Sequence, residues 1–128
     1  MLTEIEADSL IQMHKIFLSP PTILLLPGTD ESHDLVGDYG RERFLLDLWR
    51  GTLRLSKIKL QTRGRKTVVL VRLDVASAPH TNPDGSRLGG THLHVYRQGY
   101  EDKWAYPLNP EEFRDPSNIL ETFRDFCQ

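Results

Sequence analysis

The fold is decided by one stretch, Lys66-Thr67-Val68-Val69-Leu70-Val71-Arg72-Leu73-Asp74-Val75, in which apolar and polar side chains alternate. Such alternation is typical of a strand with one buried face. Two sets of side chains share the two faces: Val69, Val71, Leu73 and Val75 on one, and Leu70, Arg72 and Asp74 on the other. We therefore expect this strand to bury its valines and leucine and to turn its charged side chains away from the core.

The preceding residues continue the pattern as an antiparallel meander. Strands are predicted over residues 42–50, 53–62 and 66–75, with a break at Gly51 and a turn at residues 63–65. In the middle strand the side chains of Lys57, Lys59, Gln61 and Arg63 share one face, and those of Ile58, Leu60 and Thr62 share the other. The basic groups therefore form a row.

Helices are predicted at both ends of the chain. Thr3 to Glu6 has the pattern of a capping box, and the apolar stripe behind it runs until Ser19-Pro20-Pro21 ends the helix. Asn109-Pro110 and Asp115-Pro116 both resemble helix starts ahead of an amphipathic C-terminal helix. Residues 23–26 predict a buried strand or extended segment, and residues 30–34 an exposed loop.

These elements predict one α+β domain over residues 1–128, with a curved, mainly antiparallel sheet of about five or six strands flanked by N- and C-terminal helices. The chain has 38% hydrophobic and 27% charged residues, and no apolar run approaches the roughly 20 residues that span a bilayer. Its N-terminus carries acids where a secretory signal carries basic residues. With one cysteine, Cys127, we expect a reducing cytoplasm and no membrane segment.

The charge distribution is uneven along the chain, although the formal net charge is only −2. Nine basic residues lie between Arg41 and Lys66, against only Glu42 and Asp47, while both ends of the chain are acidic. Such a segment either folds against the acidic ends or presents a positive face to an anionic partner. The sequence leaves both alternatives open.

Polar and titratable side chains gather around one predicted turn. Asn82-Pro83-Asp84-Gly85 is a strong turn pattern. Its return should bring His80 near the strand that carries His92 and His94, and so form a three-histidine cluster. Because strand side chains alternate, His92, His94 and Tyr96 are predicted on one face and Leu93 and Val95 in the core.

A histidine pair with this spacing suits three roles. His80, His92 and His94 are the candidate catalytic acids and bases for proton transfer, in a reading that needs neither metal nor cofactor. In a metal site the ligands would be His92, His94 and His80, with Asp74 or Asp84 as further candidates. The third reading is a polar strand face with ordinary hydrogen bonds.

Basic side chains near the histidines suggest phosphate or partner contacts. The candidates are Lys57, Lys59, Arg63, Arg65, Arg72, Arg97 and Lys103. Small ribonucleases combine such cations with a base for the ribose 2′-hydroxyl and an acid for the leaving oxygen. The alternative is a set of solvated strand charges that discourage edge-to-edge aggregation.

A resemblance rests on four blocks of the C-terminal two thirds. They are Gln61-Thr62-Arg63-Gly64-Arg65, residues 69–74, His80-Thr81-Asn82-Pro83-Asp84-Gly85 and residues 92–105. Together they resemble a family of small, functionally uncharacterised proteins of bacteria, their phages and mobile elements. The chain departs from that pattern at Thr91, where the family has proline, and at Gln98, where it has an acidic residue.

The setting that the resemblance implies is bacterial conflict, by association only. The favoured function is a cytoplasmic phosphate-binding or nucleic-acid-binding module of such systems, in its most specific form a metal-independent endoribonuclease toxin acting on RNA. One alternative is a non-catalytic phage or mobile-element protein that inhibits a host defence complex, for example as an anti-CRISPR. Another is a metal-dependent enzyme built on the His-x-His pair. Oligomeric state is left open.

Overall fold

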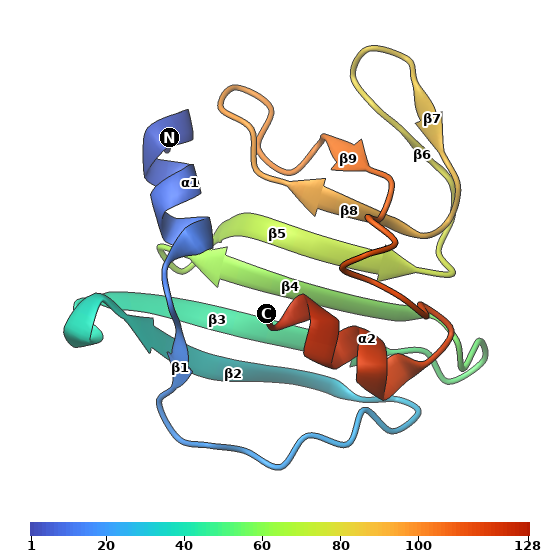
Figure 1. The fold of residues 1–128 in the computed structure, drawn as a ribbon, viewed down its shortest axis with the longest axis horizontal. Helices are drawn as coiled ribbons and strands as arrows, with labels where there is room; N and C mark the ends of the chain where they lie inside the picture. Colours follow the sequence, from blue (N-terminus) through green and yellow to red (C-terminus); the bar gives the residue numbers. More distant parts are fainter.

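A seven-stranded antiparallel sheet is the main element of the computed structural model, which describes residues 1–128 (Figure 1). Across the sheet the order is β1 (Ile16–Phe17), β2 (Asp30–Gly37), β3 (Glu42–Arg50), β4 (Ile58–Gly64), β5 (Val68–Val75), β8 (His92–Val95) and β9 (Ala105–Tyr106). The remaining elements are a hairpin of β6 (His80–Thr81) and β7 (Arg87–Leu88), the 3-10 turn η1 (Asp38–Gly40), and helices α1 (Glu4–Gln12) and α2 (Ile119–Phe126). The predicted α+β class is confirmed, with more strands than expected.

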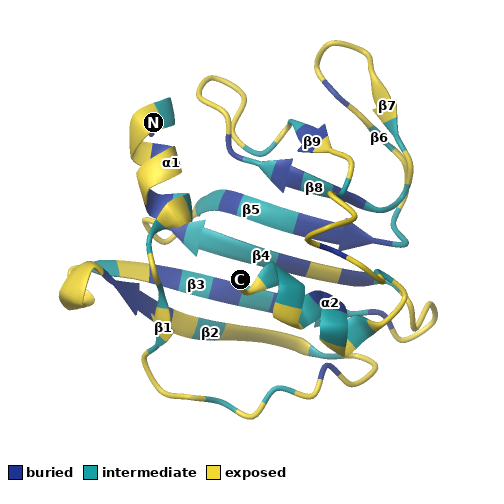
Figure 2. Ribbon diagram, viewed as in Figure 1, coloured by how far each residue is buried: buried dark blue, intermediate teal, exposed yellow.

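The two faces of the sheet differ in cover. Both helices lie over the same face (Figure 1), where α1 packs on β5 and α2 on β4. The core fills the space between them and the sheet, and Figure 2 colours parts of the central strands as buried. The fully buried side chains of the core include Phe44, Leu48, Leu60 and Leu73. No helix covers the opposite face. Removal of apolar area from water stabilises the covered side, and the uncovered side is free to carry polar chemistry.

A bulge alters the alternation predicted for β5. The pairing of β4 with β5 shifts between Thr62 and Arg63, and Val69 pairs with Arg63 while Val71 pairs with Thr62. Leu70 is the extra residue, and its side chain is fully buried in the core. The expectation that Leu70 would share a face with Arg72 and Asp74 is therefore wrong, because one inserted residue reverses the facing of all that precede it.

Two segments before β3 also differ from expectation. Residues 30–34, predicted as a loop, belong to β2, whose residues pair with β3 from Asp30 opposite Trp49 to Gly37 opposite Glu42. Residues 23–26 form no strand, because buried Leu25 has a φ of 50° that breaks the extended backbone. Polar composition concealed the strand, and apolar composition suggested one that the backbone does not form.

The helices are shorter than predicted. The Thr3–Glu6 capping box is confirmed, but α1 ends at Gln12, and Ile16 and Phe17 pair with β2. At the other end only Asn118 caps a helix; Asn109 and Asp115 each accept a hydrogen bond from the amide two residues on, which closes turns. The middle meander strand begins at Ile58, after a turn. Neither helix has the length and apolar character needed to cross a membrane.

Candidate metal centre

Two adjacent strands present the candidate site on the face of the sheet that no helix covers. In the β5–β8 ladder Arg72 pairs with His94 and Asp74 pairs with His92. The residues between them, Leu73 and Leu93, pair with each other and turn toward the helix side, where Leu93 packs against the core. Directly opposed side chains on one face lie about 4.5–5.5 Å apart at Cβ, so the register alone assembles four polar groups.

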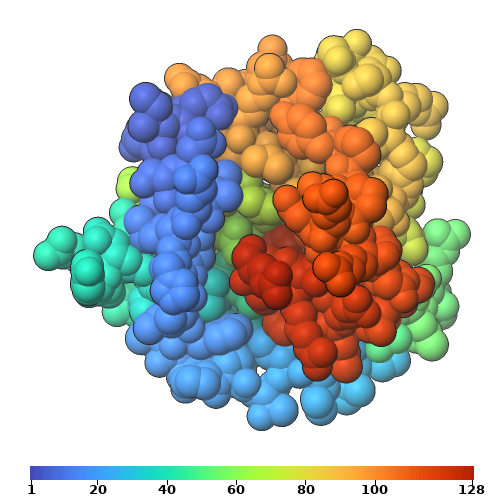
Figure 3. Space-filling view, in the orientation of Figure 1, coloured from blue at the N-terminus to red at the C-terminus, as the bar shows by residue number.

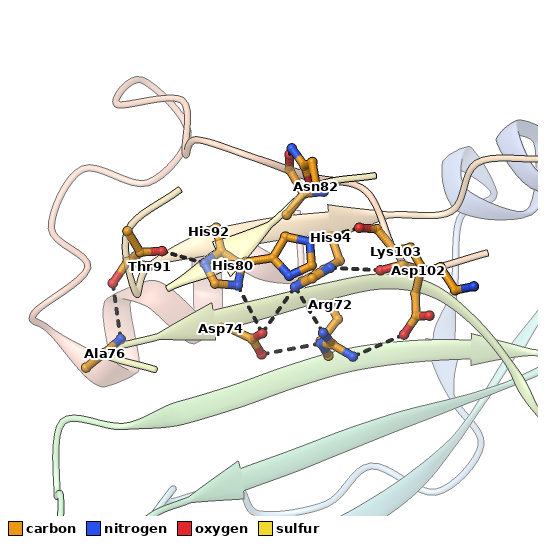
Figure 4. Close-up of polar contacts among 12 residues, drawn as sticks. Arg72, Asp74, Ala76, His80, Asn82, Thr91, His92, His94, Asp102 and Lys103 are labelled. Carbon is orange, nitrogen blue, oxygen red and sulfur yellow. Dashed lines mark hydrogen bonds and ion pairs between the residues drawn. The ribbon is translucent and has the colours of Figure 1, made fainter. Parts of the chain in front are cut away.

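The β6–β7 hairpin adds His80 to this group, as Figure 4 shows. The predicted turn at its tip is confirmed: the Gly85 amide donates to the Asn82 carbonyl at 2.9 Å, and Gly85 has a φ of 89°. The ring centroid of His80 lies 5.5 Å from that of His92 and 4.6 Å from that of His94, which are themselves 4.9 Å apart. The predicted three-histidine cluster is therefore confirmed.

Two side chains hold the hairpin over β8 and β9. The Asn82 amide donates to the Ala105 carbonyl at 3.0 Å, and its oxygen accepts from the Ala105 N–H at 2.8 Å. His80 Nε2 donates to the Lys103 carbonyl at 2.8 Å. Asn82 was singled out in the sequence only as a turn residue, and its second role depends on where the hairpin lands.

The site is enclosed. His92, His94 and Asp74 are 2%, 1% and 5% exposed. The prediction that Tyr96 shares a face with His92 and His94 is wrong. Tyr96 packs in the hydrophobic core, and its hydroxyl donates to the Leu2 carbonyl at 2.7 Å. Val95, like Leu93, faces the helix side as predicted, but both are only half-buried there, and Val95 is not part of the core.

Backbone carbonyls fix the tautomers of the two buried histidines. Nδ1 of His92 lies 2.7 Å from the Gly89 oxygen, and Nδ1 of His94 lies 2.8 Å from the Asp102 oxygen. A carbonyl only accepts hydrogen bonds, so each Nδ1 carries the hydrogen and each neutral ring keeps a lone pair on Nε2. Both Nε2 atoms point at Asp74 Oδ2, at 3.3 Å each.

Arg72 supplies the nearest positive charge. Its Nη2 donates to His94 Nε2 at 2.9 Å, and its Nη1 donates to Asp102 Oδ2 at 3.0 Å. Its Nε lies 3.4 Å from Asp74 Oδ1, yet neither of these two buried atoms has a hydrogen bond. Burial raises the pKa of Asp74, but contact with His94 and the charge of Arg72 outweigh it and hold that pKa below its usual range.

The arrangement has the dimensions of a metal site. One ligand atom from each of Asp74, His92 and His94 lies within 4.8 Å of the other two. Two ligands at 2.0–2.1 Å from a tetrahedral zinc ion are about 3.3 Å apart, which is the separation of Asp74 Oδ2 from each Nε2. Hydrogen bonds from Nδ1 to backbone carbonyls are also the usual outer-shell support of metal-binding histidines.

The two other candidate ligands lie differently. The His80 ring packs edge-on against that of His94, but its Nε2 is engaged by the Lys103 carbonyl. The Asp84 carboxylate stays in the exposed turn, where it accepts hydrogen bonds from the Ser86 amide and hydroxyl. The structure therefore brings Asp74, and not Asp84, to the histidine pair. The shared two-residue spacing of Arg72-x-Asp74 and His92-x-His94 is the sequence pattern that could have identified this set.

The candidate phosphate contacts are mostly engaged within the protein. Arg63 donates to Asp47, Arg65 to Glu42, and Arg72 to Asp102 and His94. The Arg97 guanidinium lies over the Trp104 and Tyr100 rings, at 4.5 and 5.7 Å from their centroids. Lys57 and Lys59 lie over Trp49, at 5.8 and 5.9 Å from its ring centroid, and the exposed Lys103 approaches the cluster through its backbone.

Asp47 joins several of these groups on the uncovered face. Its carboxylate accepts a bidentate pair from Arg63, at 2.6 and 2.8 Å, and further hydrogen bonds from Ser32 and Gln61. Burial raises the pKa of Asp47, but these hydrogen bonds outweigh it and the pKa is lowered from its ordinary 3.8. Hydrogen bonds to an ionised carboxylate are stronger than those to a neutral oxygen, so the four donors stabilise the fold most when Asp47 is charged.

We expect Asp47→Asn to lower the free energy of unfolding by about 2 kcal/mol at pH 7. The stabilisation by the carboxylate is fully present above its unfolded pKa, near 3.8, and is lost as the pH falls through the lower folded value. Urea denaturation of both proteins between pH 7 and pH 3 measures this, with exposed Asp34→Asn as the control. A difference that does not shrink in acid contradicts the assignment.

The chain belongs to DUF6978, a family of unknown function whose model matches residues 2–128. No curated protein and no solved structure gives a significant match. Membership of an uncharacterised family agrees with the resemblance seen in the sequence.

Proposed function

We propose that this member of the family is a metal-dependent protein in which His92, His94 and Asp74 bind one divalent transition-metal ion. One observation carries the proposal: inside the protein the Nε2 atoms of both histidines lie 3.3 Å from the same carboxylate oxygen, and the three ligand atoms are all within 4.8 Å of one another. Arg72 offsets part of the repulsion among these atoms by donating to His94 Nε2, and a metal ion between all three would offset it more completely. Two imidazoles and one carboxylate suit zinc or iron(II).

Three ligands leave a coordination position open, as in catalytic metal sites. His80 lies beside both histidines without belonging to the ligand set, and can hold or move a proton there. A metal-independent ribonuclease would instead need Nε2 of His92 or His94 to reach a ribose hydroxyl, and both rings are almost wholly buried. The burial of both rings therefore favours histidines that bind a metal ion over histidines that exchange protons directly with RNA.

Titration of chelator-treated protein with Zn²⁺ and Co²⁺ tests this proposal. We expect one equivalent to bind, with tetrahedral cobalt absorption and a rise in melting temperature. Asp74→Asn, His92→Gln and His94→Gln should each weaken binding by about 10²-fold or more, whereas His33→Gln, outside the cluster, should not. Equal binding by all these variants would show that the metal sits elsewhere.

Arg72 provides a test of opposite sign. Because its Nη2 occupies the lone pair of His94 Nε2, an ion must displace that hydrogen bond. We expect Arg72→Gln to bind the metal more tightly than the wild type, since it removes both the competing donor and a like charge. Circular dichroism without metal separates a binding effect from unfolding. Weaker binding by a folded Arg72→Gln variant would contradict this geometry.

The second candidate function is phosphate or RNA binding on the same uncovered face. An open hollow of about 570 Å³ lies there, and its lining residues are Asp30, Ser32, Asp47, Trp49, Lys59, Gln61, Arg63 and Arg72. The ammonium groups of Lys57 and Lys59 flank Trp49. An indole beside cations is a platform on which a base can stack while its phosphate is neutralised.

Salt-dependent RNA binding tests this second function. We expect a single-stranded oligonucleotide to bind with an affinity that falls steeply with salt, because counterions are released. The double variant Lys57→Glu/Lys59→Glu should lose binding, while Arg114→Glu/Arg124→Glu, which reverses two exposed charges near and on α2, should keep most of it. Flat salt dependence, or equal loss in both variants, would count against the hollow.

The proposed setting is the cytoplasm of a bacterium or of its phages and mobile elements. The resemblance in sequence supports this setting, and the lone Cys127 is consistent with a reducing compartment. Cleavage of bound RNA would favour a toxin, and binding without cleavage would favour a module. If the protein binds no RNA, and a partner protein binds in the hollow, the anti-defence alternative would be favoured.

A further inference from the structure

A cavity of about 650 Å³ lies on the helix side of the sheet, away from the site described above. Leu46, Val71 and Leu93 of the sheet contribute to its lining, together with Met13 after α1 and Phe126 of α2. Eleven of its 18 lining residues are hydrophobic, so the space favours an apolar occupant. Figure 3 shows the recess between the blue N-terminal segment and the red C-terminal helix.

The cavity follows from the lengths of the helices. α1 and α2 have only nine and eight residues and stand apart over the sheet, so the part of the sheet between them has no helix over it (Figure 1). Leu93 and Val71 are consequently half-buried where a longer helix would have buried them fully. Apolar side chains at an unfilled space forgo dispersion contacts, which an apolar ligand restores.

The polar groups of the cavity select the charge of its ligand. Lys15 is the lysine of the lining, but its ammonium donates to the carbonyls of Leu10, Ile11 and Met13 at 2.7, 3.1 and 3.0 Å. An ammonium has three hydrogens, so none is left for a ligand. The lysine ammonium that could have bound a fatty-acid carboxylate is thus fully engaged by the protein, and His14 is the other basic residue of the lining.

One acidic side chain of the lining is in the opposite condition. Asp125 Oδ2 is shielded from solvent and has no hydrogen-bond partner, whereas Glu112, the second carboxylate of the lining, is exposed and accepts a hydrogen bond from Asn109. A buried acceptor without a donor is costly, and a charged donor satisfies it best. The unmatched demand of the cavity is therefore for a cationic donor beside an apolar body.

We propose that this cavity binds an amphipathic amine, with its apolar body over Val71 and Leu93 and its ammonium at Asp125. The volume falls within the usual range of small-molecule sites. The proposal is independent of the metal site, since none of its residues is shared with Asp74, His92 or His94.

Calorimetric titration of the full chain with decylamine, decanol and decanoate tests the proposal at one chain length. We expect decylamine to bind at one equivalent and at least tenfold more tightly than decanoate. Asp125→Asn should reduce decylamine to the affinity of decanol, while Asp8→Asn, an exposed acid on α1, should leave it unchanged. Val71→Phe should weaken all three ligands by filling the space.

Two results would overturn the proposal. The first is decanoate binding as tightly as decylamine, which would assign the site to an anionic lipid. The second is decylamine binding that survives both Asp125→Asn and Val71→Phe, which would indicate adsorption elsewhere. Circular dichroism of each variant verifies its fold, and Asp125→Asn preserves the shape of the side chain.

Discussion

Gly90→Ala is expected to lower the free energy of unfolding by about 3 kcal/mol or more. A Cβ at this position would overlap the carbonyl oxygen of Ser77, and its next nearest neighbours are the Ser77 carbonyl carbon and amide nitrogen at 3.1 and 3.3 Å. These are backbone atoms that cannot rotate away. The Gly90 carbonyl also accepts from the Ser77 amide at 2.8 Å, so relief of the clash breaks the contact that leads into β8.

The neighbouring glycine is the matched control. A Cβ at Gly89 would meet nothing within 4 Å, so Gly89→Ala should change stability by less than about 1 kcal/mol. Urea denaturation of both variants gives the comparison. Because the clash lies two residues before His92, Gly90→Ala should also abolish the rise in melting temperature that we expect on metal binding. Equal stability of the two variants would show that the Ser77 backbone moves freely.

Asn82→Ala is expected to cost about 3 kcal/mol of unfolding free energy. It removes two hydrogen bonds to the Ala105 backbone, and Asn82 and Ala105 are only 7% and 2% exposed. The substitution therefore leaves a buried amide and a buried carbonyl without partners, each worth roughly 1–3 kcal/mol. Faster hydrogen exchange at the Ala105 amide would locate the effect at β9.

Thr81→Ala provides the comparison for this prediction. Thr81 is exposed and adjacent in β6, so its truncation should stay within about 0.5 kcal/mol. Asn82→Asp should resemble Asn82→Ala, because a carboxylate oxygen would face the Ala105 carbonyl in place of the donor. A stable Asn82→Asp protein would mean that the hairpin is not fastened by this amide.

The sequence predicted the side-chain cluster of the candidate site better than the boundaries of the secondary-structure elements. Alternation in residues 66–75 placed Arg72 and Asp74 on the same face of one strand. Alternation in residues 92–96 likewise placed His92 and His94 on the same face of a second strand. Turn chemistry at Asn82–Gly85 brought His80 to them. Which strand neighbours which was not predicted, because β5 pairs with β8 across the excursion that holds the β6–β7 hairpin. The Asp74 carboxylate was thus one candidate among several until the register was known.

Errors arose where tertiary contacts override local preference. Charged residues 30–34 form a strand because the ladder with β3 satisfies their backbone, and composition does not report a partner strand. The stripe after α1 continued at helical spacing, yet Ile16 and Phe17 join β2. The burial of His92 and His94 was also unforeseen: the turn pattern predicted that His80 would come near them, but not that the β6–β7 hairpin would be fastened to Ala105 and Lys103 and so enclose both rings.

The partners of α1 determine when the N-terminus can fold. The Tyr96 hydroxyl donates to the Leu2 carbonyl, the Glu4 amide donates to Gln98 Oε1, and the Gln98 amide donates to the Glu4 carboxylate, each across 94 residues. Contacts of such separation form late, because a long loop must close first. During synthesis on a ribosome, α1 therefore cannot dock on the sheet until the turn after β8 has emerged. Its apolar face, with Ala7 and Leu10, is a chaperone-accessible surface until then.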